Sequence, residues 1–449
     1  MTVKKIQDVS KISGEPTKDF FISMLIKDIT LKDAIGDLID NAIDGAKRNA
    51  KNNDLTEYFV HILASKNKFE IVDNCGGIDI NIARNYAFRF GRPEEYKIEK
   101  NSIGQFGIGM KRAFFKIGND ISVKSIAKNS EFLLKIKVKD WRKKKEWAFN
   151  LNSFEENKTP YSITKRGTHI TIETLNSDAE TSFNSDVFIQ ELRDEIAYEH
   201  LYSINKGLEL KINEFSVKSP NLKLIYDNNF KPAYWQHSFD EKLKVDVLCG
   251  ISEDKGDEGG WYIFCNERLI TGPDTSSVTG WTGRREGAEG VAAYHDQFHR
   301  FRGYVFFNSP DASKLPWNTT KTGIDKDSIK YQFVKRKMIE MMKPTMKLMN
   351  LLKKEREKNK PVKEQPLNQK VENAKVVLIS EILKKKNNLS ENFVFPIEKK
   401  KNEKLGEGRI SFVRPYEQII KVKRALNVTT LTEVGEETFD YFYNREVRG

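Results

Sequence analysis

Three polar side chains on one predicted helix have the types and spacing that could hold a metal ion and a water molecule. Asp37, Asn41 and Asp44 occupy positions i, i+4 and i+7 within DAIGDLIDNAIDGA (33–46). On a helix, these spacings place the three side chains on one face. An amide oxygen one turn from a carboxylate can position a hard cation and its water. Taken alone, the stripe favours a simpler interpretation, the solvated face of an amphipathic helix.

A fourth polar side chain follows a short apolar strand. In IVDNCGGID (71–79), Asp73 ends the strand and Gly76 and Gly77 follow almost at once. Glycine lets the backbone turn sharply or approach a ligand closely. Asp73 could therefore accept a hydrogen bond from the exocyclic amine of a purine. An ordinary turn at a strand end would contain the same residues.

A glycine-rich run then leads into a predicted helix. SIGQFGIGMKRAFFKIG (102–118) has glycines at 104, 107 and 109, followed by Lys111. Such a run exposes backbone N–H groups at a helix N-terminus, where the helix dipole favours an anion. The ammonium group of Lys111 is a point charge suited to phosphate. The spacing matches neither the Walker motif nor the dinucleotide fingerprint, so the run alone is a weak indication.

The elements that must position these residues form a mixed α+β pattern. Apolar residues from Leu31 to Ile43 recur three and four apart, which predicts helix over 18–50, and another helix begins near residue 110. Short β-branched and aromatic runs predict strands at 58–64, 68–73, 120–127, 132–139 and 167–174. We therefore predict a first α+β domain over residues 1–175.

Two further regions are predicted after the first domain. Residues 176–330 contain an amphipathic helix (186–204) and strand-like runs at 208–215, 243–251, 260–270 and 302–308. Residues 331–449 are predicted to be basic and mostly helical, with a linker at 360–370.

Composition and charge exclude several classes of protein. With 28 Phe, 15 Tyr and 6 Trp in 449 residues, the chain has ample surface to bury, which excludes disorder throughout. It has no long apolar stretch for a transmembrane helix, no secretory h-region, and no metal-ligand spacing among its three cysteines and six histidines. A reducing cytoplasm fits these features best. Residues 330–409 carry 22 Lys and Arg against 10 Glu, a surplus that equals the whole net charge of +12.

The three motifs, in this order, resemble the ATP-binding signature of the GHKL superfamily. That superfamily includes gyrase-type topoisomerases, the heat-shock chaperone ATPase, MutL mismatch-repair proteins, histidine kinases and MORC proteins. RGTHITI (166–172) is similar to a fourth element of the signature, a Gly-Thr pair that enters a strand beneath the nucleotide. YIFCNERLI (262–270) and LPWNTTKTGID (315–325) resemble the strand motif and the lysine loop of the transducer domain in gyrase and MutL. The resemblance covers roughly residues 15–330.

The resemblance implies a fold, cofactors and roles for individual residues. It implies a Bergerat-type ATP-binding sandwich, a transducer domain and the cofactors ATP and Mg²⁺. Asn41 would ligate Mg²⁺, Asp73 would hydrogen-bond adenine with help from Thr168, and Lys321 would reach the γ-phosphate. The lid corresponds to residues 89–103. The other implied nucleotide contacts are Asp44, Gly77, Gly104, Gln105, Phe106, Gly107, Gly109 and Lys111.

Two positions depart from the family's pattern. The usual general base is a glutamate four residues before the magnesium asparagine, and here that position is Asp37. The shorter side chain would leave its carboxylate about 1 Å short of the attacking water, and such a misplacement can cost about a hundredfold in rate. We therefore expect slow turnover. Cys75 replaces the first glycine of the usual D-x-G-x-G motif, and we expect it to be a small packing residue rather than a nucleophile.

These observations predict an ATPase that works as a conformational switch, closest in style to bacterial MORC- and MutL-like proteins. ATP binding would close the lid and dimerise the N-terminal domains, in DNA management or in defence against phage. Residues 330–409 would bind nucleic acid, or else present a solvated helical face or bind an acidic protein. The alternatives are a client-binding chaperone related to the heat-shock ATPase and an ATP sensor with little turnover.

Overall fold

The chain forms two compact units, Met1–Pro396 and Ile397–Gly449. The computed structural model describes residues 14–91, 103, 107–283, 290–357, 365–396 and 410–447. Within these ranges, no helix combines the length and the apolar content needed to cross a membrane.

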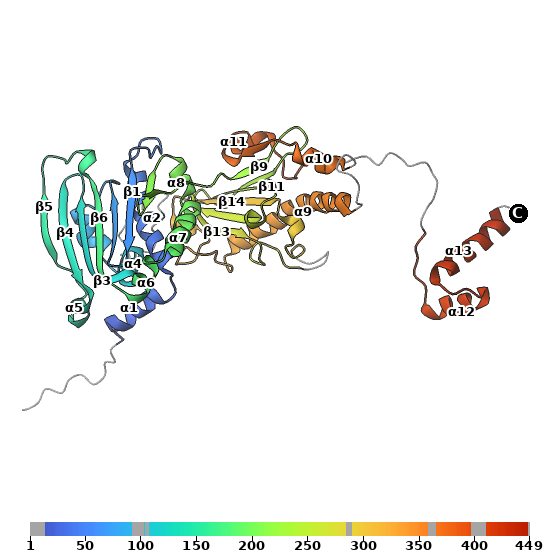
Figure 1. Ribbon diagram of the computed structural model, residues 1–449, viewed down its shortest axis with the longest axis horizontal. Helices are drawn as coiled ribbons and strands as arrows, with labels where there is room; N and C mark the ends of the chain where they lie inside the picture. The colour runs from blue at the N-terminus through green and yellow to red at the C-terminus, as the bar shows by residue number, and fades with distance from the viewer. Residues whose placement is uncertain are drawn as a thin grey trace, which may run out of the picture. The chain divides into compact units, whose positions relative to one another are not determined.

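An eight-stranded sheet organises the first part of the larger unit (Figure 1). Its strand order is β5-β4-β3-β6-β2-β1-β7-β8, and only the β1–β7 pair is parallel. The bounds of the strands are β1 (Phe59–Ser65), β2 (Lys68–Asp73), β3 (Gly118–Ile126), β4 (Ser130–Lys137), β5 (Leu151–Glu156), β6 (Gly167–Leu175), β7 (Glu209–Ile212) and β8 (Phe215–Ser216). All five predicted strands of this region are present. Strand β5 escaped prediction because its side chains are mostly exposed and lack an alternating pattern.

Helices pack beside this sheet, and together they form an α+β sandwich. The N-terminal helical region is two helices rather than the single one we predicted, α1 (Lys18–Lys27) and α2 (Leu31–Asn49). A capping box causes the break. Thr30 Oγ1 accepts a hydrogen bond from the Asp33 N–H at 3.1 Å, and the Asp33 carboxylate accepts one from the Thr30 N–H at 2.8 Å. This reciprocal pair begins a new helix.

The remaining helices of this part are short. Helix α4 (Gly109–Ile117) starts at the predicted position and packs against α2. The others are α3 (Ile80–Ile82), α5 (Val138–Lys143), α6 (Ser177–Phe183), α7 (Asp186–Glu199) and α8 (Leu201–Asn205). Helices α7 and α8 occupy the region where one amphipathic helix was predicted.

A five-stranded sheet organises the second part of the larger unit. Its order is β10-β11-β14-β12-β13, with β12 and β14 parallel. The strands are β10 (Ala233–Ser238), β11 (Lys244–Ile251), β12 (Gly260–Cys265), β13 (Arg268–Asp274) and β14 (Phe301–Asn308). Helix α9 (Ile329–Glu357) packs against β11 and β14.

The C-terminal region is divided between the two units. In the larger unit, α10 (Pro366–Glu372) packs on α9, β15 (Val376–Leu378) pairs with β9 (Lys223–Ile225), and α11 (Ile379–Lys384) follows. The predicted linker was therefore wrong over 366–370, because Leu367 and Val371 of α10 are buried. The smaller unit contains α12 (Tyr416–Leu426) and α13 (Leu431–Phe442). The division into domains at residues 175 and 330 stays a prediction. Strands β7 and β8, which follow residue 175, also pair with the first sheet.

Candidate nucleotide site

A pocket between helix α2 and the first sheet brings together several of the predicted binding residues. Asn41 comes from α2, Asp73 from the end of β2, and Thr168 from β6, where it pairs in register with Asp73. The pocket is lined by Leu38, Asn41, Ala42, Gly45, Arg48, Ile71, Asp73, Cys75, Gly77, Ile78, Met110, Thr168 and Ile170. Its walls are largely apolar and its few polar groups converge, as in most small-molecule sites.

Asp73 is held in one orientation by two backbone donors. The N–H groups of Cys75 and Thr168 both donate to Asp73 Oδ1, at 2.8 and 3.3 Å. Burial raises the pKa of Asp73 to about 6, and these two donors only partly offset that effect. Within the described ranges, no hydrogen bond uses Oδ2. Asp73 is therefore oriented with one oxygen available to a donor in the pocket.

The turn after Asp73 depends on glycine at one position and accepts cysteine at another. Gly77 has a φ of +69°, and an added Cβ would lie 2.1 Å from the Ile126 carbonyl oxygen. Cys75 is buried, and burial raises the pKa of its thiol well above the ordinary value. A thiol that resists ionisation is a poor nucleophile. This environment favours a packing role for Cys75.

The glycine-rich run approaches the pocket, although part of it lies outside the described residues. Gly104, Gln105 and Phe106 are among those outside, as are residues 92–102 of the expected lid. Gly107 has a φ of +65°. The Ile103 N–H donates to both carboxylate oxygens of Asp44, at 2.9 and 3.1 Å. Asp44 therefore anchors the backbone of this run to α2.

Lys111 has a different immediate environment from the one its motif indicates. Its side chain is buried, and its ammonium donates to the Gly107 carbonyl and to the Ala87 carbonyl, the latter at 2.8 Å. These bonds hold the start of α4 against the segment after β2. The phosphate role of Lys111 stays a prediction.

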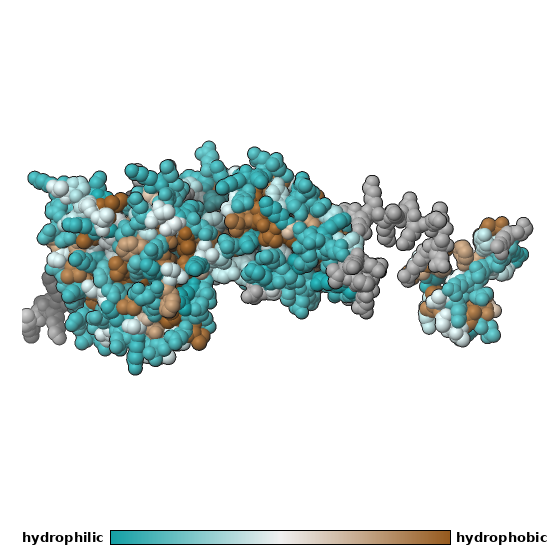
Figure 2. Space-filling view, turned by 45° about the horizontal axis from the view of Figure 1, so that its top comes forward, coloured by the Kyte–Doolittle hydropathy of each residue, from teal (hydrophilic) through white to brown (hydrophobic). Residues whose placement is uncertain are grey.

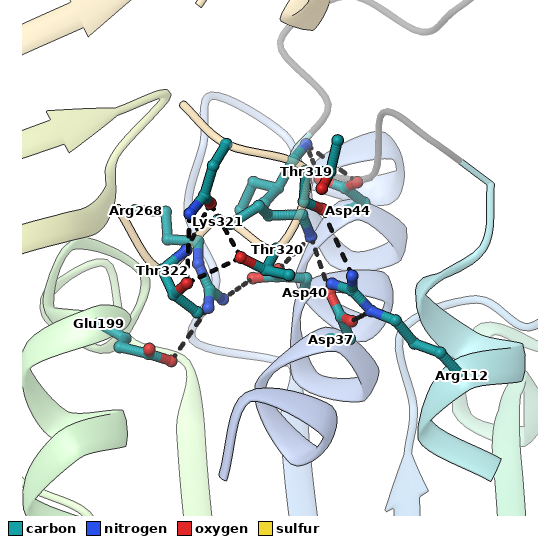
Figure 3. A network of polar contacts seen from close by, with 12 residues as sticks. Asp37, Asp40, Asp44, Arg112, Glu199, Arg268, Thr319, Thr320, Lys321 and Thr322 are labelled. Carbon is teal, nitrogen blue, oxygen red and sulfur yellow. Dashed lines mark hydrogen bonds and ion pairs between the residues drawn. The ribbon is translucent and has the colours of Figure 1, made fainter. Parts of the chain in front are cut away.

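A buried network of charges lies on the α2 side of the site (Figure 3). The Lys321 ammonium donates to Asp40 Oδ2 at 2.6 Å and to Asp37 Oδ1 at 3.1 Å. The Arg112 Nε, from α4, donates to Asp37 Oδ2 at 2.6 Å. Only 3–6% of the Asp37, Lys321 and Arg112 side chains is exposed. A lysine far along the chain therefore reaches the helix that carries Asn41.

The network continues into the second sheet through Arg268 at the start of β13. Arg268 Nη1 donates to Asp40 Oδ1 at 2.5 Å, and Nη2 lies 3.2 Å from Glu199 Oε2. Burial raises the pKa of Glu199 to about 8 and lowers that of the adjacent His200 to about 3, so both are uncharged near pH 7. Arg268 and Lys321 hold the pKa of Asp40 well below its usual value, despite burial. At neutral pH, three cations thus surround the two carboxylates Asp37 and Asp40.

Sequence reasoning missed Arg112, Arg268, Glu199 and Asp40 as members of this network. Arg112 and Arg268 do lie inside quoted motifs, next to Lys111 and after Asn266-Glu267, so their positions were available as a signal. Their pairing with α2 could not be read from the spacing. Gly109 also contacts this network, because an added Cβ would lie 3.0 Å from the Asp37 carboxyl carbon.

The residues present are compatible with a magnesium ion that is held mainly by its nucleotide. Asn41 is exposed in the pocket wall and offers one amide oxygen. The described part of the chain has no group of three or more His, Cys, Asp or Glu placed to bind a metal. Mg²⁺ commonly keeps several waters and binds one or two protein oxygens together with substrate phosphates. Asn41 would supply such an oxygen, and the ion would neutralise phosphate charge.

Comparison with known proteins agrees with this architecture. Residues 29–195 match the family model described as "Histidine kinase-, DNA gyrase B-, and HSP90-like ATPase". The match spans α2 through α7 and includes Asp37, Asn41, Asp73 and Thr168. Over these residues the chain is similar to GHKL-type ATPases, whose general activity is the binding and hydrolysis of ATP. A search among curated proteins found no match.

Neutralising a buried carboxylate of α2 should lower the free energy of unfolding more than neutralising an exposed partner of the same helix. Asp40→Asn should lower the free energy of unfolding by about 3–5 kcal/mol, because Arg268 and Lys321 would stay buried with less compensation. Urea denaturation followed by tryptophan fluorescence would measure it. The control is Glu191→Gln, which breaks the Lys32–Glu191 pair of 2.9 Å between α2 and α7, where Glu191 is 57% exposed. That change should cost less than about 1 kcal/mol. Equal effects would contradict the account.

Proposed function

We propose that this protein is a Mg-ATP-dependent conformational switch of the MORC or MutL type. The supporting observation is that Lys321, from the second part of the chain, is buried against Asp37 and Asp40 of the ATPase domain. In this proposal, Lys321 contacts the γ-phosphate and thereby couples nucleotide binding to the second sheet. ATP binding closes the lid and dimerises the ATPase domains, and hydrolysis resets them.

The geometry suggests how nucleotide binding would change the network. In the structure, Asp37 Oδ2 accepts from Arg112 and Asp37 Oδ1 accepts from Lys321, so both carboxylate oxygens are engaged. A γ-phosphate near α2 would compete with Asp37 and Asp40 for the Lys321 ammonium. Transfer of Lys321 to the phosphate would release one oxygen of Asp37 to act as the general base. Binding and hydrolysis would then be linked through one lysine.

A second candidate function is an ATP sensor with little turnover. The observation that favours it is the double pairing of Asp37, which leaves the proposed base bound to Arg112 even if Lys321 departs. Aspartate also reaches less far than the glutamate usual in the family. The two functions share the nucleotide site and differ only in whether hydrolysis is fast enough to reset the switch.

The basic surface of α9 supports an action on nucleic acid. Arg336, Lys343, Lys347 and Lys354 are exposed and spaced seven, four and seven residues apart, so they follow one helix face. Other lysines of the region are engaged within the fold, such as Lys337 with Glu340 and Glu391. We propose that an ATP-gated dimer binds a duplex against these α9 faces, in DNA management or anti-phage defence in the cytoplasm. Residues 397–409, the end of the predicted nucleic-acid-binding region, lie outside the described residues.

Hydrolysis should depend on Asp37 and Lys321 in different ways. Asp37→Asn should keep ATP binding within a few-fold yet lower turnover by about a hundredfold or more, because it removes the base. Lys321→Ala should lower turnover and weaken ATP-dependent dimerisation. Calorimetry and phosphate-release assays would measure both, with Lys326→Ala as an exposed lysine control from the same loop. Wild-type turnover in Asp37→Asn would place the base elsewhere. A faster Asp37→Glu would show that reach limits the rate.

Adenine recognition by Asp73 should depend on pH in a defined direction. Because the pKa of Asp73 is about 6, the carboxylate that accepts from the adenine amine is lost as the pH falls through that value. ATP affinity should then fall by up to about tenfold per pH unit below 6, as linkage to one proton requires. The Asp73→Asn variant should bind ATP more weakly at pH 7.5. Its affinity should also lack the fall below pH 6 that protonation of Asp73 causes. ATP titrates near the same pH, so the test is the difference between the two calorimetric pH profiles. Parallel profiles would contradict the assignment.

Nucleic-acid binding should depend on salt through the α9 face. For duplex DNA, log affinity should fall with log salt by about 0.9 for each phosphate contacted. The double change Lys343→Glu and Lys347→Glu should reduce the slope by about 2 and leave ATP binding unchanged. Lys158→Glu with Lys165→Glu is the matched control, because both lysines are exposed and lie in the first domain. Absence of binding at about 50 mM salt, with or without ATP, would instead favour an acidic protein partner.

A further inference from the structure

Four aromatic side chains gather where strand β10 meets helix α9, in the second part of the larger unit. Trp235 and His237 lie two residues apart on β10, so they share one face of the strand. Phe239 follows at the same interval, directly after the strand. Phe333 of α9 contacts all three, with ring centroids 6.1, 5.0 and 5.4 Å from those of Trp235, His237 and Phe239. We call these four residues the aromatic platform.

The platform lies at the edge of the hydrophobic core and not inside it. Phe333 is 40% exposed, whereas Trp235, His237 and Phe239 are half-buried. The rings of Trp235 and His237 are nearly parallel, with an interplanar angle of 4°. On the face of the larger unit seen in Figure 2, hydrophilic residues predominate and hydrophobic ones form small patches. Exposed aromatic rings offer such a surface both apolar area and a π-face for stacking.

The basic face of α9 begins at the platform. Four exposed cations follow Phe333 along the helix after 3, 10, 14 and 21 residues: Arg336, Lys343, Lys347 and Lys354. At about 100° per residue, these intervals place all four within about 80° of Phe333 around the helix axis. At about 1.5 Å per residue, the face from Phe333 to Lys354 is about 32 Å long. One turn of B-form DNA has nearly the same length, about 34 Å.

The chemistry of the two features identifies a ligand that fits both. A row of cations attracts the phosphates of a nucleic acid whatever its sequence. Aromatic side chains stack on nucleobases. Inside a duplex, however, each base face is already covered by the neighbouring base pair, so stacking on a protein ring requires an unpaired base. A basic row one helical turn long with aromatic rings at its end therefore fits a duplex that continues into a single strand.

We propose that the aromatic platform binds unpaired bases of a nucleic acid whose duplex part lies along α9. This inference rests on the nucleic-acid binding proposed above, and it adds the class of nucleic acid, a junction between double and single strand. Phe333 is the most exposed ring of the platform, so it takes the first unpaired base. The cations from Arg336 onwards contact the phosphates of the duplex.

The first test compares two DNA probes that differ only in the bases of a tail. Both have a duplex of about 12 base pairs and a tail of about eight nucleotides, which are thymidines in one probe and abasic sites in the other. Because the phosphates are equal in number, stacking alone should make the full-length protein bind the thymidine tail about tenfold more tightly, measured by fluorescence anisotropy. Equal affinities would overturn this inference and leave duplex binding by α9 intact. Binding of neither probe at about 50 mM salt would overturn both.

Substitution of Phe333 tests the assignment to the platform. Phe333→Ala should abolish the preference for the thymidine tail and leave the affinity for the abasic probe within about twofold, because phosphate contacts remain. Phe333→Tyr keeps the ring and should keep the preference. The matched control is Phe154→Ala, which removes a 51% exposed aromatic residue from β5 and should also keep it. An undiminished preference in Phe333→Ala would place the bases elsewhere and overturn the assignment.

Photochemical crosslinking locates the contact in the unaltered protein. Bromouracil replaces the thymine of the tail that is nearest the duplex, and the complex is irradiated. The crosslinked peptide, identified by mass spectrometry, should contain Phe333 or residues 233–239. Crosslinks confined to other parts of the chain would overturn the proposal, whatever the behaviour of the Phe333 variants.

Discussion

The burial of Lys321 beside two aspartates is the interaction on which the larger unit depends. A buried ammonium is tolerated only with close counter-charges, and Asp37 and Asp40 supply them from a single helix. Asp40 in turn pairs with Arg268 at the start of β13, and Asp37 pairs with Arg112 in α4. Four segments distant in the sequence are therefore held together by charge as well as by apolar packing. A change at one member alters the electrostatic environment of the others.

In the proposed switch, the same network couples the nucleotide to the second sheet. Apolar contacts are not selective for an anion, but the buried cations Arg112, Arg268 and Lys321 are. Burial keeps Glu199 and His200 uncharged near neutral pH, so these two side chains add no charge to the network. An incoming phosphate would exchange for carboxylates as the partner of a cation, and the loop that carries Lys321 would move with its side chain. This is the kind of differential contact that a conformational switch requires.

Charges elsewhere in the chain have a different physical role. On α9, four cations lie on one exposed face, where they are screened by salt and contribute little to stability: Arg336, Lys343, Lys347 and Lys354. In the smaller unit, basic and acidic residues are separated onto α12 and α13. Buried charges thus link the helices of the first sheet to the second sheet, whereas exposed charges determine which surfaces could meet a partner.

The sequence by itself determined the class of fold and the local elements of the site. Periodic apolar residues defined the helical region of α2, and β-branched runs located the strands whose ends carry Asp73 and Thr168, because these signals act over a few residues. Only the tertiary structure decided the partners of Lys111, which donates to backbone carbonyls, and of Lys321, which lies 281 positions from Asp40. It also decided that Arg112, Arg268 and Glu199 belong to the network. Such pairings depend on which segments the fold brings together and on how strongly burial disfavours an unpaired charge, and neither is encoded in local spacing.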